Sequence, residues 1–221
     1  MDFGFVKWID HAGFLIEAKS GKIAIDPFRV RAPDKIGKVD LIFVTHPHFD
    51  HMSEKDIGAL SGKSTKIIAP KGALGTLKVK GMDALVVEPN KQYSISGIGF
   101  ETVPAYNTNP DRLSYHPKSN GWVGYIINID GYRIYHAGDT DFVEEMKNIK
   151  ADLALIPIGG TYTMTVEEAI AASKEIDAKY FAPMHYKSLL GKAYAAAEDK
   201  FEKGVKNSTI FEQIQEPYYS F

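Results

Sequence analysis

The chain has 221 residues, 44% of them hydrophobic and 24% charged, which is ordinary for a globular protein and sufficient for a full core. A formal net charge of −2 argues against a general nucleic-acid-binding protein, and the absence of cysteine excludes disulfides and thiolate metal sites. No run is long enough to span a membrane, and the N-terminus lacks the layout of a signal peptide. We therefore expect one domain over residues 1–221, located in the cytoplasm.

Short apolar or alternating runs dominate the first half of the chain and predict strands. They cover residues 5–9, 14–18, 22–26, 41–44, 66–69, 84–88, 93–95 and 98–103. The continuous apolar run 41–44 is typical of a strand covered on both faces. Ser53, followed by acidic residues, predicts a helix that ends near Gly62, and residues 71–77 suggest a short helix.

The second half alternates strand and helix. Residues 105–120 are polar and lack apolar periodicity, and a loop of this length inside a domain is usually functional. Asp130-Gly131 predicts a hairpin between strands 121–129 and 132–136. Thr165 and Glu168 form a capping box that opens a helix to about residue 176. Strands at 153–158 and 180–183 and a helix at 193–201 complete one domain of two sheets flanked by helices.

The most informative motif directly follows the apolar run 41–44. It reads Thr45-His46-Pro47-His48-Phe49-Asp50-His51. Imidazole and carboxylate are ligands that zinc and related divalent ions prefer. Side chains two apart in an extended segment point the same way, so His46 and His48 can hold one ion. Asp50 and His51 follow in a tight turn and can reach a second ion, which predicts a two-metal hydrolytic site.

Two further strand ends carry residues of the metal-binding type. Asp139 follows Gly138, where backbone can approach closely, and is placed to bridge two ions. His185 comes just after the strand 180–183. Taken singly, Asp139 is more often a turn or helix-cap residue and His185 a buried core histidine. Their occurrence at separate strand ends favours the metal interpretation.

Three other residues are predicted to support the site rather than bind metal. His11 lies in the turn between the first two strands, where its ring can orient a ligand or loop. Asp26 ends the third strand and either supports the site or caps a turn. His136 is expected inside a strand, in a structural or supporting role.

These motifs together resemble the metallo-β-lactamase superfamily. The flanking segments are similar to the branch that contains ascorbate-6-phosphate lactonase and related metal-dependent hydrolases. The resemblance covers residues 8–187 and rests on the motif 46–51, on Gly138-Asp139 and on His185, with these flanking segments: Trp8-Ile9-Asp10-His11-Ala12-Gly13-Phe14-Leu15-Ile16-Glu17, Ile25-Asp26-Pro27, His136-Ala137-Gly138-Asp139-Thr140, Ile156-Pro157-Ile158-Gly159-Gly160 and Pro183-Met184-His185-Tyr186.

The resemblance implies an αββα sandwich, an α/β fold of two mixed sheets flanked by helices, with two metal ions at one edge. It implies the following ligands: His46 and His48 for the first ion, Asp50, His51 and His185 for the second, and Asp139 as the bridge. Members commonly add a third histidine to the first ion, but here the corresponding segment reads Pro104-Ala105-Tyr106-Asn107. Either the long loop brings His116 to the ion, or Asn107 substitutes as a weaker ligand; we favour His116.

The predicted reaction is hydrolysis by a metal-bound hydroxide that attacks an ester, lactone or phosphodiester. The ions are expected to be zinc, with manganese or iron as alternatives. Asp50 is the candidate catalytic residue because its carboxylate can shuttle a proton. Lys187 and Arg112 are candidates for binding an anionic group of a small substrate, although each alone is more often a solvated surface residue.

A second class of function stays open, in which the chain is a non-catalytic metal-binding or regulatory protein that retains the fold. We expect no nucleic-acid or membrane partner. A homo-oligomer is possible, because residues 216–221 include three aromatic side chains that can pack on the domain or on a neighbouring subunit.

Overall fold

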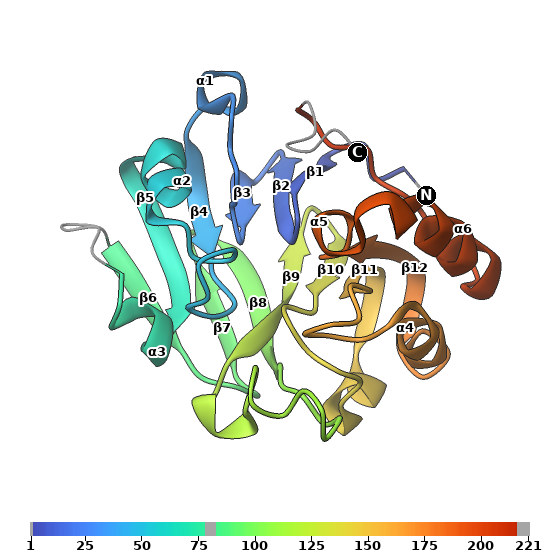
Figure 1. Cartoon of the computed structure of the whole chain (residues 1–221). Helices are drawn as coiled ribbons and strands as arrows, with labels where there is room; N and C mark the ends of the chain where they lie inside the picture. Colours follow the sequence, from blue (N-terminus) through green and yellow to red (C-terminus); the bar gives the residue numbers. More distant parts are fainter. Residues whose placement is uncertain (1, 78–82, 216–221) are drawn as a thin grey trace. The chain divides into compact units, whose positions relative to one another are not determined.

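The computed structural model describes residues 2–77 and 83–215, and these form two compact units. The N-terminal unit runs through Val87 and includes residues 211–215, whereas the C-terminal unit comprises residues 88–210. Each unit is built on one six-stranded sheet (Figure 1). Single-domain organisation over 1–221 stays a prediction, and the expectation for residues 216–221 lies outside the described residues.

The sheet of the N-terminal unit is mixed. Its strands follow chain order: β1 (Val6–Asp10), β2 (Gly13–Ala18), β3 (Gly21–Ile25), β4 (Val39–Phe43), β5 (Ser61–Pro70) and β6 (Asp83–Val87). The first three strands pair antiparallel, and β3 to β6 pair parallel. The segment 211–215 returns to this sheet, where the Ile214 amide donates to the Trp8 carbonyl at 2.9 Å.

Three short helices accompany this sheet: α1 (Pro33–Ile36), α2 (Glu54–Leu60) and α3 (Lys71–Leu74). Ile57 and Leu60 of α2 pack in one buried cluster with Ile42 of β4 and Ile67 of β5. The start of α2 after Ser53 is confirmed, because the Ser53 hydroxyl accepts from the Asp56 amide. The helix ends at Leu60, two residues before the predicted end near Gly62, and β5 begins directly at Ser61. Sequence analysis also missed α1 and made α3 too long.

The sheet of the C-terminal unit is mixed in the same way, in the order β12-β11-β10-β9-β8-β7. Its strands are β7 (Gln92–Ile95), β8 (Ile98–Pro104), β9 (Val123–Ile129), β10 (Tyr132–His136), β11 (Lys150–Pro157) and β12 (Asp177–Met184). Strands β7 to β10 pair antiparallel, including the predicted hairpin at Asp130-Gly131, and β10 to β12 pair parallel.

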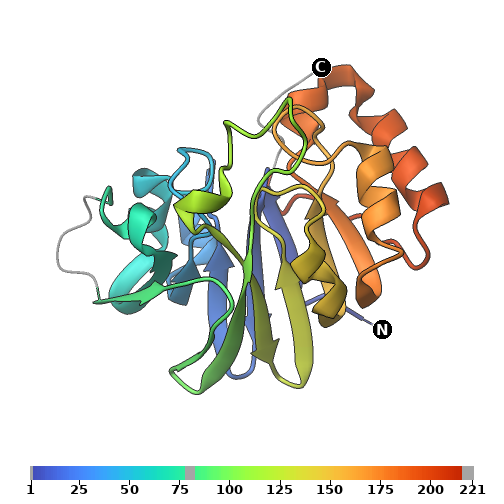
Figure 2. The same cartoon turned by 90° about the horizontal axis from the view of Figure 1, so that it is seen from below.

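Helices α4 (Val166–Ala172) and α6 (Tyr194–Gly204) lie side by side in this unit (Figure 2). The unit also contains α5 (Lys187–Leu190) and three 3₁₀ turns, η1 (Lys118–Asn120), η2 (Glu144–Asn148) and η3 (Gly191–Ala193). The capping box of Thr165 and Glu168 is confirmed, although α4 ends four residues earlier than expected. The two mixed sheets with flanking helices agree with the predicted fold class.

No helix among the described residues is long and apolar enough to cross a membrane. The cytoplasmic location stays a prediction.

Candidate functional site

A histidine cluster of the N-terminal unit lies where β3 and β4 end. The two strands are parallel neighbours, so their carboxyl ends reach the same edge of the sheet. Asp26 directly follows β3, and the motif 45–51 follows β4. Ligand-type atoms of Asp26, His46 and His51 lie within 4.8 Å of one another, and all three residues are buried.

The Asp26 carboxylate organises this cluster. It accepts hydrogen bonds from the Thr45 amide at 2.8 Å, the Thr45 hydroxyl at 2.6 Å and His51 Nδ1 at 2.7 Å. An ionised carboxylate only accepts, so Nδ1 of His51 carries the proton and its Nε2 presents a lone pair. Asp26 thus contacts both Thr45 and His51, and its role in supporting a metal site stays a prediction.

The same carboxylate acts on His46 through Thr45. The Thr45 hydroxyl gives its proton to Asp26, so its oxygen accepts from His46 Nδ1 at 2.9 Å. The lone pair of His46 then lies on Nε2, which is 3.0 Å from Nδ1 of His48. Asp26 thus positions Nδ1 of both His46 and His51, through Thr45 for His46 and directly for His51.

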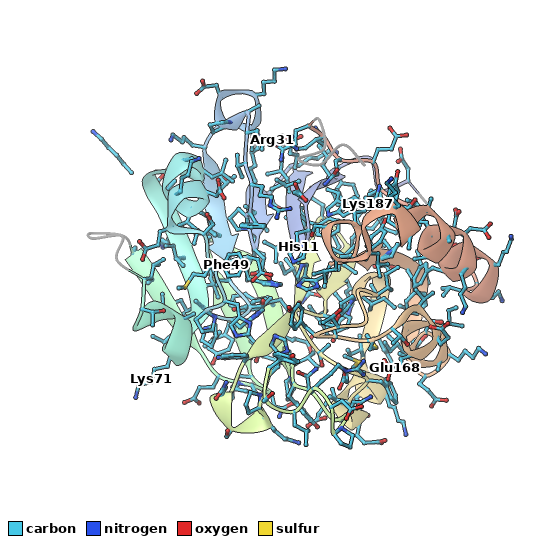
Figure 3. All side chains as sticks on the ribbon, in the orientation of Figure 1. His11, Arg31, Phe49, Lys71, Glu168 and Lys187 are labelled. Carbon is cyan, nitrogen blue, oxygen red and sulfur yellow. The ribbon has the colours of Figure 1, made fainter. Side chains whose placement is uncertain are left out.

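Asp50 lies beside His11, whose Nε2 is 3.0 Å from the Asp50 Oδ2. The side chain of His11 is 3% exposed and that of Asp50 is 20% exposed. The Asp50 carboxylate therefore contacts a buried histidine on one side and is accessible to solvent on the other. His11 contacts the Asp50 carboxylate, and its supporting role at a metal site stays a prediction. Figure 3 marks His11 and Phe49, the latter strongly exposed on the same motif.

A second cluster lies in the C-terminal unit and is centred on Asp139. Its Oδ2 is 3.3 Å from Nε2 of His116 and 3.1 Å from Nε2 of His185. All three side chains are at most 3% exposed. Asp139 follows β10 and His185 directly follows β12, whereas His116 comes from the long loop. The structure therefore brings His116 to Asp139 and His185, as expected if the loop folds back.

Backbone packing fixes the position of His185. Its φ angle of 57° lies in the left-handed region, which is uncommon for a residue with a side chain. Gly159, after β11, approaches so closely that a Cβ at this position would lie 2.3 Å from the His185 carbonyl oxygen. A larger residue at 159 would displace the backbone of His185.

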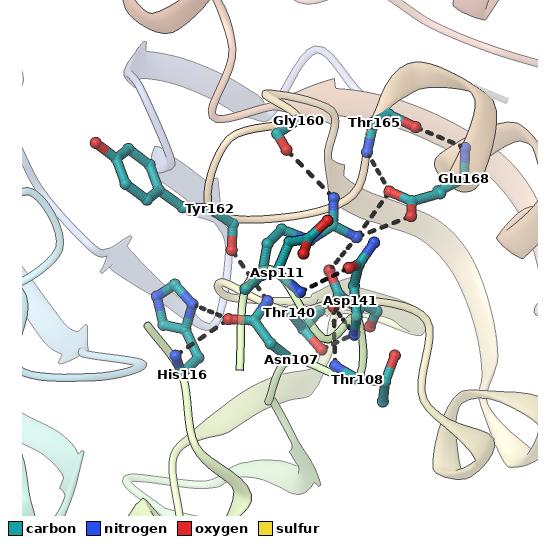
Figure 4. Close-up of polar contacts among 12 residues, drawn as sticks. Asn107, Thr108, Asp111, His116, Thr140, Asp141, Gly160, Tyr162, Thr165 and Glu168 are labelled. Carbon is teal, nitrogen blue, oxygen red and sulfur yellow. Dashed lines mark hydrogen bonds and ion pairs between the residues drawn. The ribbon is translucent and has the colours of Figure 1, made fainter. Parts of the chain in front are cut away.

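Asp141 ties the long loop to the segment that carries Asp139 (Figure 4). Its Oδ2 accepts from the amides of Thr108 and Asn109 at 2.8 and 2.9 Å. Its Oδ1 is 2.9 Å from the guanidinium of Arg112. Because Asp139 and Asp141 belong to one short segment, the loop that carries His116 is anchored two residues from Asp139.

Arg112 is buried and its guanidinium is engaged inside the protein. Besides Asp141, it binds both oxygens of Glu168 at 2.8 and 2.9 Å and the Gly160 carbonyl at 3.2 Å. These contacts favour a structural role over the substrate-binding role predicted for Arg112. Sequence analysis missed this network, because no local pattern pairs Arg112 with residues 29 and 56 positions away.

The remaining predicted residues are placed as follows. His136 ends β10, is fully buried, and accepts from the Gly138 amide through Nδ1 at 3.2 Å; its structural or supporting role stays a prediction. Asn107 contacts His116 rather than Asp139, with its Oδ1 2.8 Å from His116 Nδ1. Lys187 begins α5, where its Nζ is 3.0 Å from Glu198. A role for Lys187 in substrate binding stays a prediction.

The separations within each cluster fit ligands of a divalent ion. Two nitrogen or oxygen atoms that bind one zinc ion tetrahedrally at about 2.0–2.1 Å lie about 3.3 Å apart. The pair His46–His48 and the two pairs made by Asp139 lie at 3.0, 3.3 and 3.1 Å. Burying ionisable groups so closely is costly unless a cation or proton is shared among them. The donor set contains only nitrogen and oxygen, as expected for a chain without cysteine.

Comparisons with known proteins agree with this chemistry. Residues 5–185 match the family model described as a β-lactamase superfamily domain. The chain is 33% identical over 193 residues to a UPF0173 metal-dependent hydrolase of Methanosarcina mazei, with 82% of each chain covered. It is 36% identical over 196 residues to one from Pyrococcus abyssi, with 82% of this chain and 84% of the relative covered.

A solved structure is similar as well. A metal-dependent hydrolase from Parabacteroides distasonis superposes with a TM-score of 0.82 at 33% identity, covering 94% of this chain and 92% of that one. The predicted superfamily and its fold class of two mixed sheets flanked by helices are confirmed. The narrower likeness to the ascorbate-6-phosphate lactonase branch stays a prediction.

Proposed function

Because the chain belongs to the metallo-β-lactamase superfamily and is a metal-dependent hydrolase, we propose that it cleaves an ester-type bond, in a lactone or a phosphodiester, of a small anionic substrate. A sugar-phosphate lactone is the first candidate. The main support is the Asp139 carboxylate, which lies buried between Nε2 atoms of His116 and His185 at 3.3 and 3.1 Å.

We assign the ligands of two ions, proposed to be zinc, as follows. His46, His48 and His116 would hold the first ion and Asp50, His51 and His185 the second, with Asp139 shared by both sets. Imidazole-rich sets of this kind suit zinc, while manganese and iron are the alternatives. The arrangement within each cluster supports this assignment. His46, His51 and His116 each have Nδ1 engaged by the protein, and Nε2 of His46 and of His116 lies beside another candidate ligand, His48 and Asp139 respectively.

Bound divalent ions supply an acidified water and a Lewis acid that polarises the substrate oxygen. The protein holds the ligands of the ions in place and supplies a side chain that carries a proton. Asp50 is the carrier in this proposal, since its carboxylate is 20% exposed and His11 holds its Oδ2 at 3.0 Å. A carboxylate fixed in this way can receive a proton from the attacking water and pass it to the leaving oxygen.

Lys187 is the proposed partner for the anionic group of the substrate. Its Nζ lies 3.0 Å from Glu198 and 4.9 Å from the centre of the Tyr194 ring, and its side chain is 17% exposed. A partly buried ammonium at the start of α5, two residues after His185, can bind a phosphate as a point charge. Arg112 is not part of this proposal, because its guanidinium is engaged internally.

The proposal is tested by measuring metal content and turnover in the same preparations. We expect two ions per chain by elemental analysis, and hydrolysis that is lost with a chelator and restored by zinc. Asp139→Ala should lose bound metal and activity. Asp34→Ala, an acid-to-alanine change at an exposed position of α1, should retain both.

A substrate panel then separates the two ester classes. Turnover of sugar-phosphate lactones supports the lactone as substrate class. Turnover of bis-aryl phosphates alone would make the phosphodiester the first candidate instead. Full activity in metal-free protein, or unchanged metal content in Asp139→Ala, would refute the proposal. Two bound ions without turnover of any ester would favour the non-catalytic metal-binding alternative.

A further inference from the structure

Asn107 is hydrogen-bonded to His116 and to Tyr162 through its side chain and its backbone. Its Oδ1 accepts from the His116 amide at 3.1 Å and lies 2.8 Å from His116 Nδ1. Its Nδ2 donates to the Tyr162 carbonyl at 3.0 Å, and its own amide donates to the His116 carbonyl at 2.9 Å. Both Asn107 and His116 are buried.

These partners determine which way the Asn107 amide points. A backbone amide only donates and a backbone carbonyl only accepts, so the contacts with His116 N and Tyr162 O place the oxygen toward His116 and the nitrogen toward Tyr162. The amide oxygen cannot donate, so Nδ1 of His116 must carry the proton. The lone pair of His116 is then on Nε2, the atom that lies 3.3 Å from Asp139.

We propose that Asn107 is a positioning residue that selects the Nε2-ligating tautomer of His116 and thereby raises the affinity of the site for the first metal ion. This inference rests on the proposed function, in which His116 is a ligand. Asn107 acts in the same manner on His116 as Asp26 acts on His51, although its acceptor is a neutral amide. Partners of this kind fix the tautomer and ring orientation of a ligating histidine, and their loss typically lowers metal affinity about 10–100-fold.

A competing explanation is that Asn107 only tethers the long loop to the segment after β11 through Tyr162. Two substitutions separate these explanations. Asn107→Ala removes both the acceptor for His116 and the donor to Tyr162. Asn107→Asp keeps an acceptor for His116 but loses the donor to Tyr162. A tether is therefore broken in both variants, whereas tautomer selection is lost only in Asn107→Ala.

The first measurement is made on metal-free protein by NMR of the histidine ring nitrogens, with the His116 signals identified by their loss in His116→Ala. We expect the Nδ1-protonated form in the wild type and in Asn107→Asp, and a shift toward the other tautomer in Asn107→Ala. Asn120→Ala serves as the matched control, since it removes an exposed asparagine side chain from the same loop.

The second measurement is zinc affinity by competition with a chelator. Asn107→Ala should bind the weaker of its two zinc ions about 10–100-fold less tightly than the wild type, while Asn107→Asp and Asn120→Ala stay close to the wild type. Equal losses in Asn107→Ala and Asn107→Asp, or no loss in Asn107→Ala, would overturn the inference. If His116→Ala itself binds two zinc ions with wild-type affinity, the ligand assignment of the proposed function is the part that fails.

Discussion

Replacement of Arg112 by methionine tests whether this residue holds the long loop or binds the substrate. Methionine retains much of the aliphatic stem and removes the charge. The side chains of Arg112 and Asp141 are 7% and 4% exposed, so the substitution leaves a buried carboxylate without its cation. We expect Arg112→Met to destabilise the protein and to loosen the loop that carries His116.

The expected magnitude follows from the environment of each acid. Removal of one partner of a buried ion pair costs about 3–5 kcal/mol. Asp141 still accepts two backbone hydrogen bonds on Oδ2, so we expect a loss at the lower end of this range, about 3 kcal/mol in the free energy of unfolding. Glu168 is 37% exposed and can be solvated by water, so it adds at most about 1 kcal/mol. For a chain of this length, 3 kcal/mol corresponds to a fall in Tm of roughly 6–12 °C.

Denaturant unfolding of metal-free protein measures this loss without interference from bound ions. The double variant Arg112→Met/Asp141→Asn is the control, because the neutral amide removes the uncompensated charge and should recover part of the stability. A loss below about 1 kcal/mol, combined with a raised KM and unchanged metal affinity, would show that Arg112 binds substrate instead.

Three further predictions concern other side chains of the protein. Burial alone would raise the pKa of Glu168, but the hydrogen bonds and charge of Arg112 outweigh it and hold that pKa below its ordinary value of 4.5. Glu168 therefore contributes stability above pH 4.5 that is lost as the pH falls through its lowered folded pKa. In denaturant titrations at pH 3–6, the free energy of unfolding of Arg112→Met should fall less steeply with decreasing pH than that of the wild type. Equal slopes of free energy against pH in the two proteins would contradict this. Burial raises the pKa of Tyr135, whose hydroxyl has no hydrogen-bond partner among the described residues, so Tyr135→Phe should raise the free energy of unfolding by about 1 kcal/mol. Tyr186→Phe, which removes a hydroxyl bonded to a glutamate, should lower it, and the same sign for both variants would count against the reasoning. Asp26→Asn should weaken zinc binding roughly 10–100-fold in chelator competition, because an amide cannot accept from all three of its present donors, and wild-type affinity would disprove this role.

The motif at residues 45–51 could be interpreted from the sequence because its information is local. An apolar run predicts β4, and a histidine spacing of two predicts neighbouring side chains just beyond it. The capping box at Thr165 and Glu168 was predictable for the same reason, since both hydrogen bonds connect residues three apart. The position of Asp26 at the end of a strand was also predictable, whereas its hydrogen bonds to Thr45 and His51 were not.

The long loop shows where local reasoning ends. His116 and Asn107 were competing candidates for one ligand position, because an irregular segment has no period that relates spacing to direction. In the structure His116 lies beside Asp139, and Asn107 contacts the His116 ring, which supports His116 as the proposed ligand. Arg112 was a candidate for substrate binding for the same reason, since its partners Asp141 and Glu168 lie far along the chain.

The amino-acid sequence alone therefore determined the superfamily, the class of two mixed sheets with helices, and the residue types of a nitrogen- and oxygen-ligated metal site. The superfamily followed from the resemblance of several motifs to a known family, whereas the strands and the ligand types depend on periodicity and on residues close together in the chain. Tertiary structure decided which ring nitrogen His46, His51 and His116 present and which charges are neutralised internally. Those choices depend on hydrogen-bond partners that only folding brings within about 3 Å.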